Sequence, residues 1–141
     1  MKVSEVMTPC VEVVSPADPI VRAACLMRDK EIGFLPVIEG EKLVGGVTDR
    51  DIVIRGVADG LAAQGTIRDV MTKGAHYCFE DEDLDAAADK MSESQIRRLP
   101  VFSRANKLVG VLSLGDISQA NEDEAGNTLE QVTEAGGPHA H

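Results

Sequence analysis

The sequence has few aromatic and few basic side chains. Its 141 residues include no tryptophan, one tyrosine and three phenylalanines, and 24 acidic residues against 14 basic ones give a formal net charge of -10. Proteins that bind nucleic acid present positively charged surfaces and aromatic platforms on which bases stack. We therefore expect neither DNA nor RNA as a partner.

Cysteine is also scarce. The three cysteines, Cys10, Cys25 and Cys78, are an odd number and form no CxxC pair. The pattern predicts neither a disulfide framework nor a zinc knuckle, so we expect reduced thiols. His76 and Cys78 would share one face of a strand, but two ligands are too few for zinc. We expect no metal site, and a metal or thiol sensor at these two residues is the weakest alternative.

Long apolar runs are absent. No segment approaches the ~18 consecutive apolar residues of a membrane span, and the first ten residues, MKVSEVMTPC, lack the apolar core of a secretory signal. We expect a cytoplasmic protein that has no membrane partner. Apolar residues nevertheless make up 43% of the chain. A chain of this length buries about two thirds of its unfolded surface, so the composition predicts a folded protein.

An internal repeat organises the chain. Three pairs of segments match, the last pair after one inserted residue: VSEVMT (3–8) with IRDVMT (67–72), IGFLPV (32–37) with IRRLPV (96–101), and KLVGGVTDRDI (42–52) with KLVGVLSLGDI (107–117). We interpret residues 1–59 as repeat 1, 60–66 as a linker, 67–121 as repeat 2 and 122–141 as a flexible acidic tail.

Each repeat is predicted to contain a strand, a helix, two strands and a second helix. The predicted elements are 11–14, 19–30, 34–38, 42–48 and 48–59 in the first repeat, and 75–79, 83–94, 98–103, 107–112 and 113–121 in the second. In the first helix, Asp18 is the expected N-cap, and apolar residues from Ile20 to Met27 recur at helical spacing. About 60 residues with one apolar sheet face are marginally stable alone. The fold class is therefore α/β (α+β), with the two repeats packed face to face.

One spacing recurs at the end of each predicted strand pair. A glycine is followed after three residues by a hydroxyl and after three more by an aspartate: Gly45, Thr48, Asp51 and Gly110, Ser113, Asp116. This places the hydroxyl at a helix start and the carboxylate one turn later, where it can accept hydrogen bonds from a ribose. The helix N-terminus favours phosphate, and the glycine would let a ligand approach the backbone. The spacing is also that of a capping box, so it admits a purely structural interpretation.

Arginines near these motifs favour ligand binding over a purely structural role. Arg50 lies between Thr48 and Asp51, and Arg97 and Arg98 precede the LPV segment of the second repeat. Residues 94–121 carry four basic side chains and one acidic one, a basic island in an acidic chain. Guanidinium groups are suited to phosphate oxygens. Alternatively, arginines on a strand edge only prevent aggregation.

Together, the paired LPV segments, TDRDIVIRG and the two GxxT/SxxD endings are similar to a tandem pair of cystathionine-β-synthase (CBS) domains. The resemblance covers residues 3–120 and is closest to stand-alone bacterial pairs, which include hypoxic-response and stress proteins. It implies two repeats related by a pseudo-twofold axis, with adenine nucleotides or related adenosyl ligands bound in the cleft between them. It also implies a homodimer and regulation of an unknown protein partner.

The resemblance also assigns roles to individual residues. It implies nucleotide and ribose contacts at Thr48, Asp51, Ser113 and Asp116, phosphate contacts at Arg50, Arg97 and Arg98, and residues flanking the adenine at Thr8, Thr72, Ile32 and Ile96. The two sites are unequal, because Gly33 and Phe34 replace the arginine pair in the first repeat and Gly115 replaces Arg50 in the second.

These observations predict a non-catalytic regulatory module that binds AMP, ADP or ATP and requires no cofactor. No GxSxG, HExxH or GxxxxGK[ST] motif occurs in the sequence, so nothing indicates an enzyme. The alternative is a ligand-free structural or interaction dimer, in which the same motifs only cap helices.

Overall fold

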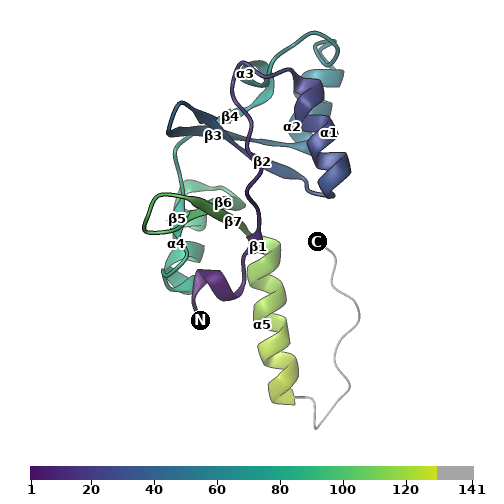
Figure 1. The fold of residues 1–141 in the computed structure, drawn as a ribbon. Helices are drawn as coiled ribbons and strands as arrows, with labels where there is room; N and C mark the ends of the chain where they lie inside the picture. Colours follow the sequence, from purple (N-terminus) through teal and green to yellow (C-terminus); the bar gives the residue numbers. More distant parts are fainter. Residues whose placement is uncertain (130–141) are drawn as a thin grey trace. The chain divides into compact units, whose positions relative to one another are not determined.

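The computed structural model describes residues 1–129, which form an α+β fold with two sheets. The chain divides into two compact units (Figure 1). Unit 1 combines Met1–Val11 with the chain from Tyr77 onward, and unit 2 is the continuous stretch Glu12–His76.

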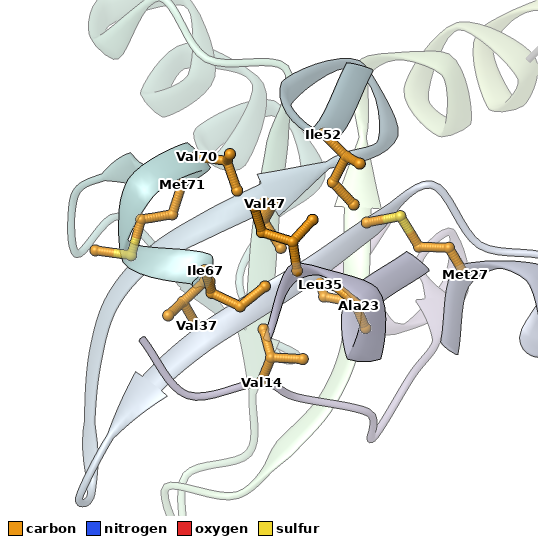
Figure 2. Close-up of a cluster of buried hydrophobic side chains, with 11 residues drawn as sticks. Val14, Ala23, Met27, Leu35, Val37, Val47, Ile52, Ile67, Val70 and Met71 are labelled. Atoms are coloured by element: carbon orange, nitrogen blue, oxygen red, sulfur yellow. The ribbon is translucent and has the colours of Figure 1, made fainter. Parts of the chain in front are cut away.

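Unit 2 contains a three-stranded antiparallel sheet in the order β2-β3-β4. Its elements are α1 (Ile20–Lys30), β2 (Phe34–Glu39), β3 (Lys42–Thr48), α2 (Asp49–Asp51), the π-helix η2 (Ile52–Val57), α3 (Ile67–Val70) and β4 (Thr72–Lys73). Its core joins Leu35 and Val37 of β2 to Ala23 and Met27 of α1, and includes residues of α3 (Figure 2). The predicted apolar face of α1 is confirmed, because Ile20, Ala23 and Met27 are buried.

Unit 1 contains a four-stranded sheet in the order β1-β7-β6-β5, in which only β5 and β6 are parallel. Its elements are η1 (Val3–Glu5, a 3-10 helix), β1 (Thr8–Pro9), β5 (Cys78–Phe79), α4 (Leu84–Ser94), β6 (Arg98–Phe102), β7 (Leu108–Ser113) and α5 (Leu114–Leu129). Fully buried Met91 of α4 packs with Leu99 and Leu112 of the sheet. This core makes α4 and the β6–β7 hairpin one body.

The two units do not follow the two sequence repeats, because the leading segment of each repeat packs with the body of the other. In unit 1, β1 pairs with β7 through Thr8 and Val111, and Val3 is fully buried. In unit 2, β4 pairs with β3, and α3, which precedes β4, belongs to the core. Residues 60–66, predicted as a linker, lie inside unit 2, where the Gly65 carbonyl accepts a hydrogen bond from the Ile20 N–H at 3.1 Å.

Three local predictions need correction. The predicted strand at 11–14 is reduced to a single bridge from Val14 to Val37, and Val11 is 73% exposed. The predicted strand at 75–79 is shortened to β5. Asp18 does not cap α1, because its carboxylate accepts a hydrogen bond from the Ser15 N–H at 2.8 Å and leaves Pro19 as the N-cap. For the two strands, the apolar pattern predicted a greater length than the one or two residues that actually pair.

Helix α5 also differs from its prediction. We expected it to end at residue 121, but it continues to Leu129. A side-chain hydrogen bond of 3.0 Å from Gln119 to Asp123, one helical turn later, supports this extension. The remainder of the predicted tail, residues 130–141, lies outside the described residues. Between residues 1 and 129, no helix is both long and apolar enough to cross a membrane.

Candidate functional site

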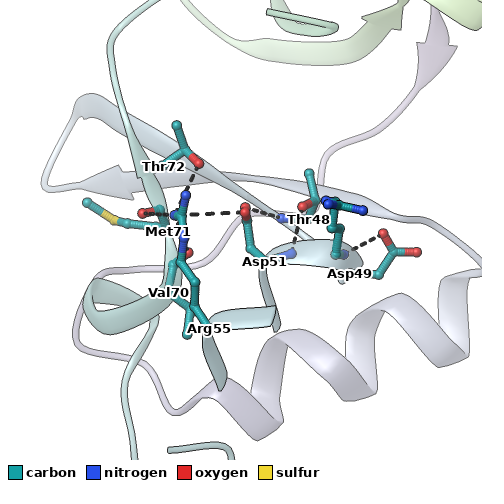
Figure 3. Close-up of polar contacts among 8 residues, drawn as sticks. Thr48, Asp49, Asp51, Arg55, Val70, Met71 and Thr72 are labelled. Carbon is teal, nitrogen blue, oxygen red and sulfur yellow. Dashed lines mark hydrogen bonds and ion pairs between the residues drawn. The ribbon is translucent and has the colours of Figure 1, made fainter. Parts of the chain in front are cut away.

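Both predicted Thr/Ser–x–x–Asp motifs form reciprocal capping boxes. The Thr48 N–H donates to Asp51 Oδ2 at 3.0 Å and the Asp51 N–H donates to Thr48 Oγ1 at 3.0 Å (Figure 3). The corresponding distances between Ser113 and Asp116 are 3.1 and 3.0 Å. Each box uses only Oδ2 of its aspartate, so Oδ1 of Asp116 remains as a possible acceptor for a ligand, whereas Oδ1 of Asp51 lies 3.8 Å from Arg55 Nη1. Capping and ligand binding are therefore compatible.

A third copy of the spacing shows that the motif alone does not identify a site. The Thr66 N–H donates to Asp69 Oδ2 at 2.9 Å at the start of α3, which sequence reasoning did not select. A capping pair stabilises the first turn of any helix. The neighbours of each pair must therefore carry the argument for ligand binding.

The two motif glycines make room for the protein's own backbone. A Cβ atom on Gly45 would fall on the carbonyl of Thr72, and one on Gly110 would lie 2.8 Å from the carbonyl oxygen of Thr8. We expected these glycines to admit a ligand. They instead allow β4 and β1 to pair closely with β3 and β7, which places Thr72 and Thr8 beside the strands that end in the capping boxes.

Unit 1 brings the arginine pair to the Ser113–Asp116 box. Arg98 is the register partner of Ser113 in the β6–β7 ladder, and the Leu114 N–H donates to the Arg97 carbonyl at 2.9 Å. Both arginine side chains are exposed, and neither has an ion pair with the side chains that the structure describes, those of residues 1–123. The start of α5 thus adjoins the backbone of two arginines whose exposed side chains could reach an anion there.

The remaining predicted residues of unit 1 lie on neighbouring segments. Exposed Thr8 lies on β1, next to β7, and half-buried Ile96 follows α4, where its N–H donates to the Met91 carbonyl at 2.9 Å. Unit 1 therefore holds one full set of predicted residues: Thr8, Ile96, Arg97, Arg98, Ser113 and Asp116.

Unit 2 holds the other set of predicted residues, but its charged side chains differ from those of unit 1. Phe34 is the register partner of Thr48, so an aromatic ring takes the place of Arg98. Exposed Arg50 lies in α2 beside Asp49, whose carboxylate accepts its backbone N–H at 2.8 Å. Half-buried Ile32 precedes β2, and exposed Thr72 lies on β4.

Arg55 is the site residue that sequence reasoning missed. Its Nη1 donates to the carbonyl oxygens of Val70 and Met71 at 3.1 and 3.2 Å (Figure 3). The same nitrogen lies 3.5 Å from Thr72 Oγ1 and 3.8 Å from Asp51 Oδ1. Two of the predicted ligand residues, Asp51 and Thr72, therefore share one guanidinium group. The sequence did contain one signal for the contact with Asp51: Arg55 follows Asp51 by four residues, which places the two side chains one helical turn apart.

The cysteine and histidine considered as a metal pair differ in exposure. Cys78 is fully buried in unit 1, whereas His76 is exposed. Burial raises the pKa of the Cys78 thiol from 9.0 to about 12, with the Glu82 carboxylate adding to the rise and Lys90 opposing it. In the part of the chain that the structure describes, no three His, Cys, Asp or Glu residues are grouped to hold a metal ion.

Alkylation should distinguish the cysteines. At about pH 8, iodoacetamide should modify half-buried Cys25 much faster than Cys78, because only thiolate reacts and Cys78 remains protonated. Peptide mass spectrometry measures the rates, and the urea-unfolded chain should lose the difference. Because folding raises this pKa, the protein should also lose stability as the pH rises from 9.0 towards 12. Equal native rates would contradict the assignment of Cys78 to the core.

Comparisons with known proteins agree with this architecture. The model of the CBS domain family matches residues 3–56 and 67–123. YlbB of Bacillus subtilis is 38% identical over 138 residues, which cover 94% of this chain and 92% of YlbB. Hypoxic response protein 1 of Mycobacterium tuberculosis is 33% identical over 117 residues, which cover 82% of this chain and 81% of that protein.

Three solved structures are similar over most of their length. CBSX2 of Arabidopsis thaliana, in complex with AMP, is 30% identical with a TM-score of 0.67, covering 88% of this chain and 98% of that chain. The CBS domain pair of MJ0100, in complex with 5'-methylthioadenosine and S-adenosylmethionine, is 28% identical with a TM-score of 0.71 and the same coverages, 88% and 98%. Hypoxic Response Protein I, with two coordinated zinc ions, is 32% identical with a TM-score of 0.68, covering 84% and 98%.

The relatives and the solved structures each match most of this chain, and the family model matches it twice, once in each sequence repeat. The predicted resemblance is thereby confirmed, and the chain belongs to the CBS domain family as a tandem pair of CBS domains.

Proposed function

We propose that this CBS pair is a non-catalytic regulatory module that binds an adenine nucleotide, AMP, ADP or ATP. The observation that carries the proposal is the surroundings of Asp116 in unit 1. Its Oδ1 is not used by the capping box, and the backbones of Arg97 and Arg98, whose side chains are exposed, adjoin the same helix start. The carboxylate can accept ribose hydroxyls and the arginines can bind phosphate.

The local charge supports a phosphorylated ligand. Uncharged Leu114 and Gly115 separate Ser113 from Asp116, so Asp116 is the one carboxylate in the first turn of α5, next to the segment that carries Arg97 and Arg98. The positive end of the α5 macrodipole adds to this potential. An adenosyl ligand without phosphate would leave the arginine pair without a partner.

Regulation follows if the ligand favours one packing of the chain over another. A nucleotide can shift an equilibrium only by its difference in affinity for the two states, and a protein partner then detects the favoured state. The equivalent motifs in both repeats favour recognition over catalysis. We place this activity in the cytoplasm, where nucleotides are available and the three thiols stay reduced.

Calorimetric titration tests the proposal. AMP, ATP, NADH and S-adenosylmethionine are each titrated into the full chain, and thermal unfolding is recorded with and without each compound. We expect saturable heat and a raised Tm with AMP or ATP, because a ligand that binds only the folded state stabilises it. No heat and no thermal shift with any compound would contradict nucleotide sensing.

We also propose that the chain forms a homodimer through the exposed face of η2. Val53, Ile54 and Val57 of η2 are 55%, 51% and 60% exposed, and Leu61 just after it is 37% exposed. Such clustered apolar side chains are typical of interaction surfaces. A second copy offers the same apolar face, whereas the net charge of -10 repels copies that meet through polar surfaces.

Val57→Glu should therefore convert a dimer to a monomer, because it places a charge in the apolar contact. Size-exclusion chromatography with light scattering measures the mass. Val11→Glu, at an apolar position that is 73% exposed outside η2, is the matched control and should remain dimeric. A monomeric wild-type chain, or a Val57→Glu dimer, would refute this interface.

A further inference from the structure

We propose that Arg55 makes the two CBS domains unequal, so that the phosphorylated nucleotide binds beside Asp116 and is excluded beside Asp51. The inference rests on the proposed function, because it specifies which of the two aspartates receives the ribose. It assigns Arg55 as the residue that determines this selectivity.

The contacts of Arg55 occupy the groups that a ligand would need. Asp51 Oδ2 is already used by the capping box, and its Oδ1 faces the Arg55 guanidinium at 3.8 Å. Thr72, the predicted adenine neighbour in unit 2, lies 3.5 Å from the same nitrogen. A ribose that approaches Asp51 must therefore compete with a positive charge already beside the carboxylate.

Arg55 is held in place by acceptors that do not depend on a ligand. The carbonyls of Val70 and Met71, which it binds at 3.1 and 3.2 Å, lie at the C-terminal end of α3. Carbonyls at a helix end have no partner within the helix and attract cations. If Arg55 moved away, these carbonyls and Asp51 would lose their shared donor.

The remaining charges favour a phosphate less in unit 2 than in unit 1. Asp49, at the start of α2, lies so close to Gly33 that a Cβ there would be 3.2 Å from its carboxylate. The matching positions in unit 1 are Leu114 and Arg97. The Asp51 position has two carboxylates, Asp49 and Asp51, against the two cations Arg50 and Arg55. Asp116 is one carboxylate against Arg97 and Arg98, so the local charge is less favourable to an anion at Asp51.

The second repeat supplies the matched comparison. Ala120 follows Asp116 by four residues, as Arg55 follows Asp51, and an alanine cannot donate to the carboxylate. A pair of reciprocal substitutions, Arg55→Ala and Ala120→Arg, therefore exchanges this feature between the two domains.

The experiment measures AMP stoichiometry and affinity by calorimetry in the wild-type chain, Asp51→Ala, Asp116→Ala, Arg55→Ala and Ala120→Arg. We expect one AMP per wild-type chain, bound about ten- to hundredfold more weakly in Asp116→Ala and with unchanged affinity in Asp51→Ala. Arg55→Ala should bind two AMP per chain, and Ala120→Arg should weaken binding about tenfold or more. If Arg55→Ala does not fold, Arg55→Gln keeps a donor for the α3 carbonyls but removes the charge.

The possible failures are distinguishable. Wild-type binding that depends on Asp51, or unchanged stoichiometry in a folded Arg55 variant, overturns the inference and leaves nucleotide binding intact. Weaker binding in Arg55→Ala would show that Arg55 holds the ligand, which also overturns it. Absence of AMP binding in all five proteins overturns the proposed function, and this inference with it.

Discussion

Replacement of Gly45 by alanine should lower the free energy of unfolding by about 3 kcal/mol, the cost of forcing an atom into well-packed space. The new Cβ would fall on the backbone carbonyl of Thr72, which cannot rotate away as a flexible side chain could. Strand β4 must then separate from β3. Because α3 immediately precedes β4, the buried side chains of Ile67 and Val70 would be displaced as well. Urea unfolding followed by circular dichroism measures the loss.

Gly56→Ala is the matched control in the same unit. Its Cβ would lie 3.6 Å from Val70 Cγ1, an ordinary contact, and its location in η2 favours alanine over glycine. We expect a change of less than about 1 kcal/mol, on the stabilising side. Similar losses in both variants would show that the β3–β4 approach is not the cause.

Asp116→Ala should weaken AMP binding by about 1.5 to 3 kcal/mol, which corresponds to roughly a ten- to hundredfold increase in Kd. The substitution removes the carboxylate proposed to accept the ribose hydroxyls. It also removes the acceptor for the Ser113 N–H, so the free energy of unfolding should fall by about 1 kcal/mol. Calorimetry and thermal unfolding measure the two effects separately.

Asp69→Ala separates capping from ligand binding. Asp69 accepts the Thr66 N–H at 2.9 Å, as Asp116 accepts that of Ser113, but it lies outside both predicted sites. This variant should lose a similar amount of stability and keep its AMP affinity. If both variants only lose stability, the alternative of a ligand-free interaction dimer is supported and nucleotide sensing is not.

The elements that the sequence predicted well are those defined by nearby residues. The β2–β3 hairpin turns at Gly40, whose positive φ of 64° suits glycine, and α4 begins at the capping residue Asp83. The exchanged strands β1 and β4 were not predicted, because two-residue strands have no periodicity. Thr8 pairs with Val111, and nothing local to either residue indicates that partner.

In the candidate site, too, contacts between nearby residues were predictable and contacts between distant segments were not. Both capping pairs lie within four consecutive residues, so their spacing was visible in the sequence. The contacts of Arg55 with Val70, Met71 and Thr72 span 15 to 17 residues, and only the fold brings them together. The glycine role was misassigned for the same reason, because the backbone that needs the space belongs to a distant segment.

The exchange of leading segments has a consequence for how the chain matures on the ribosome. Unit 2 is continuous, so all of Glu12–His76 emerges early and can fold while synthesis continues. Residues 1–11, which are translated first, gain their sheet partner only when β7 has emerged about a hundred residues later. The oldest part of the nascent polypeptide is therefore among the last to become protected from proteases and chaperones.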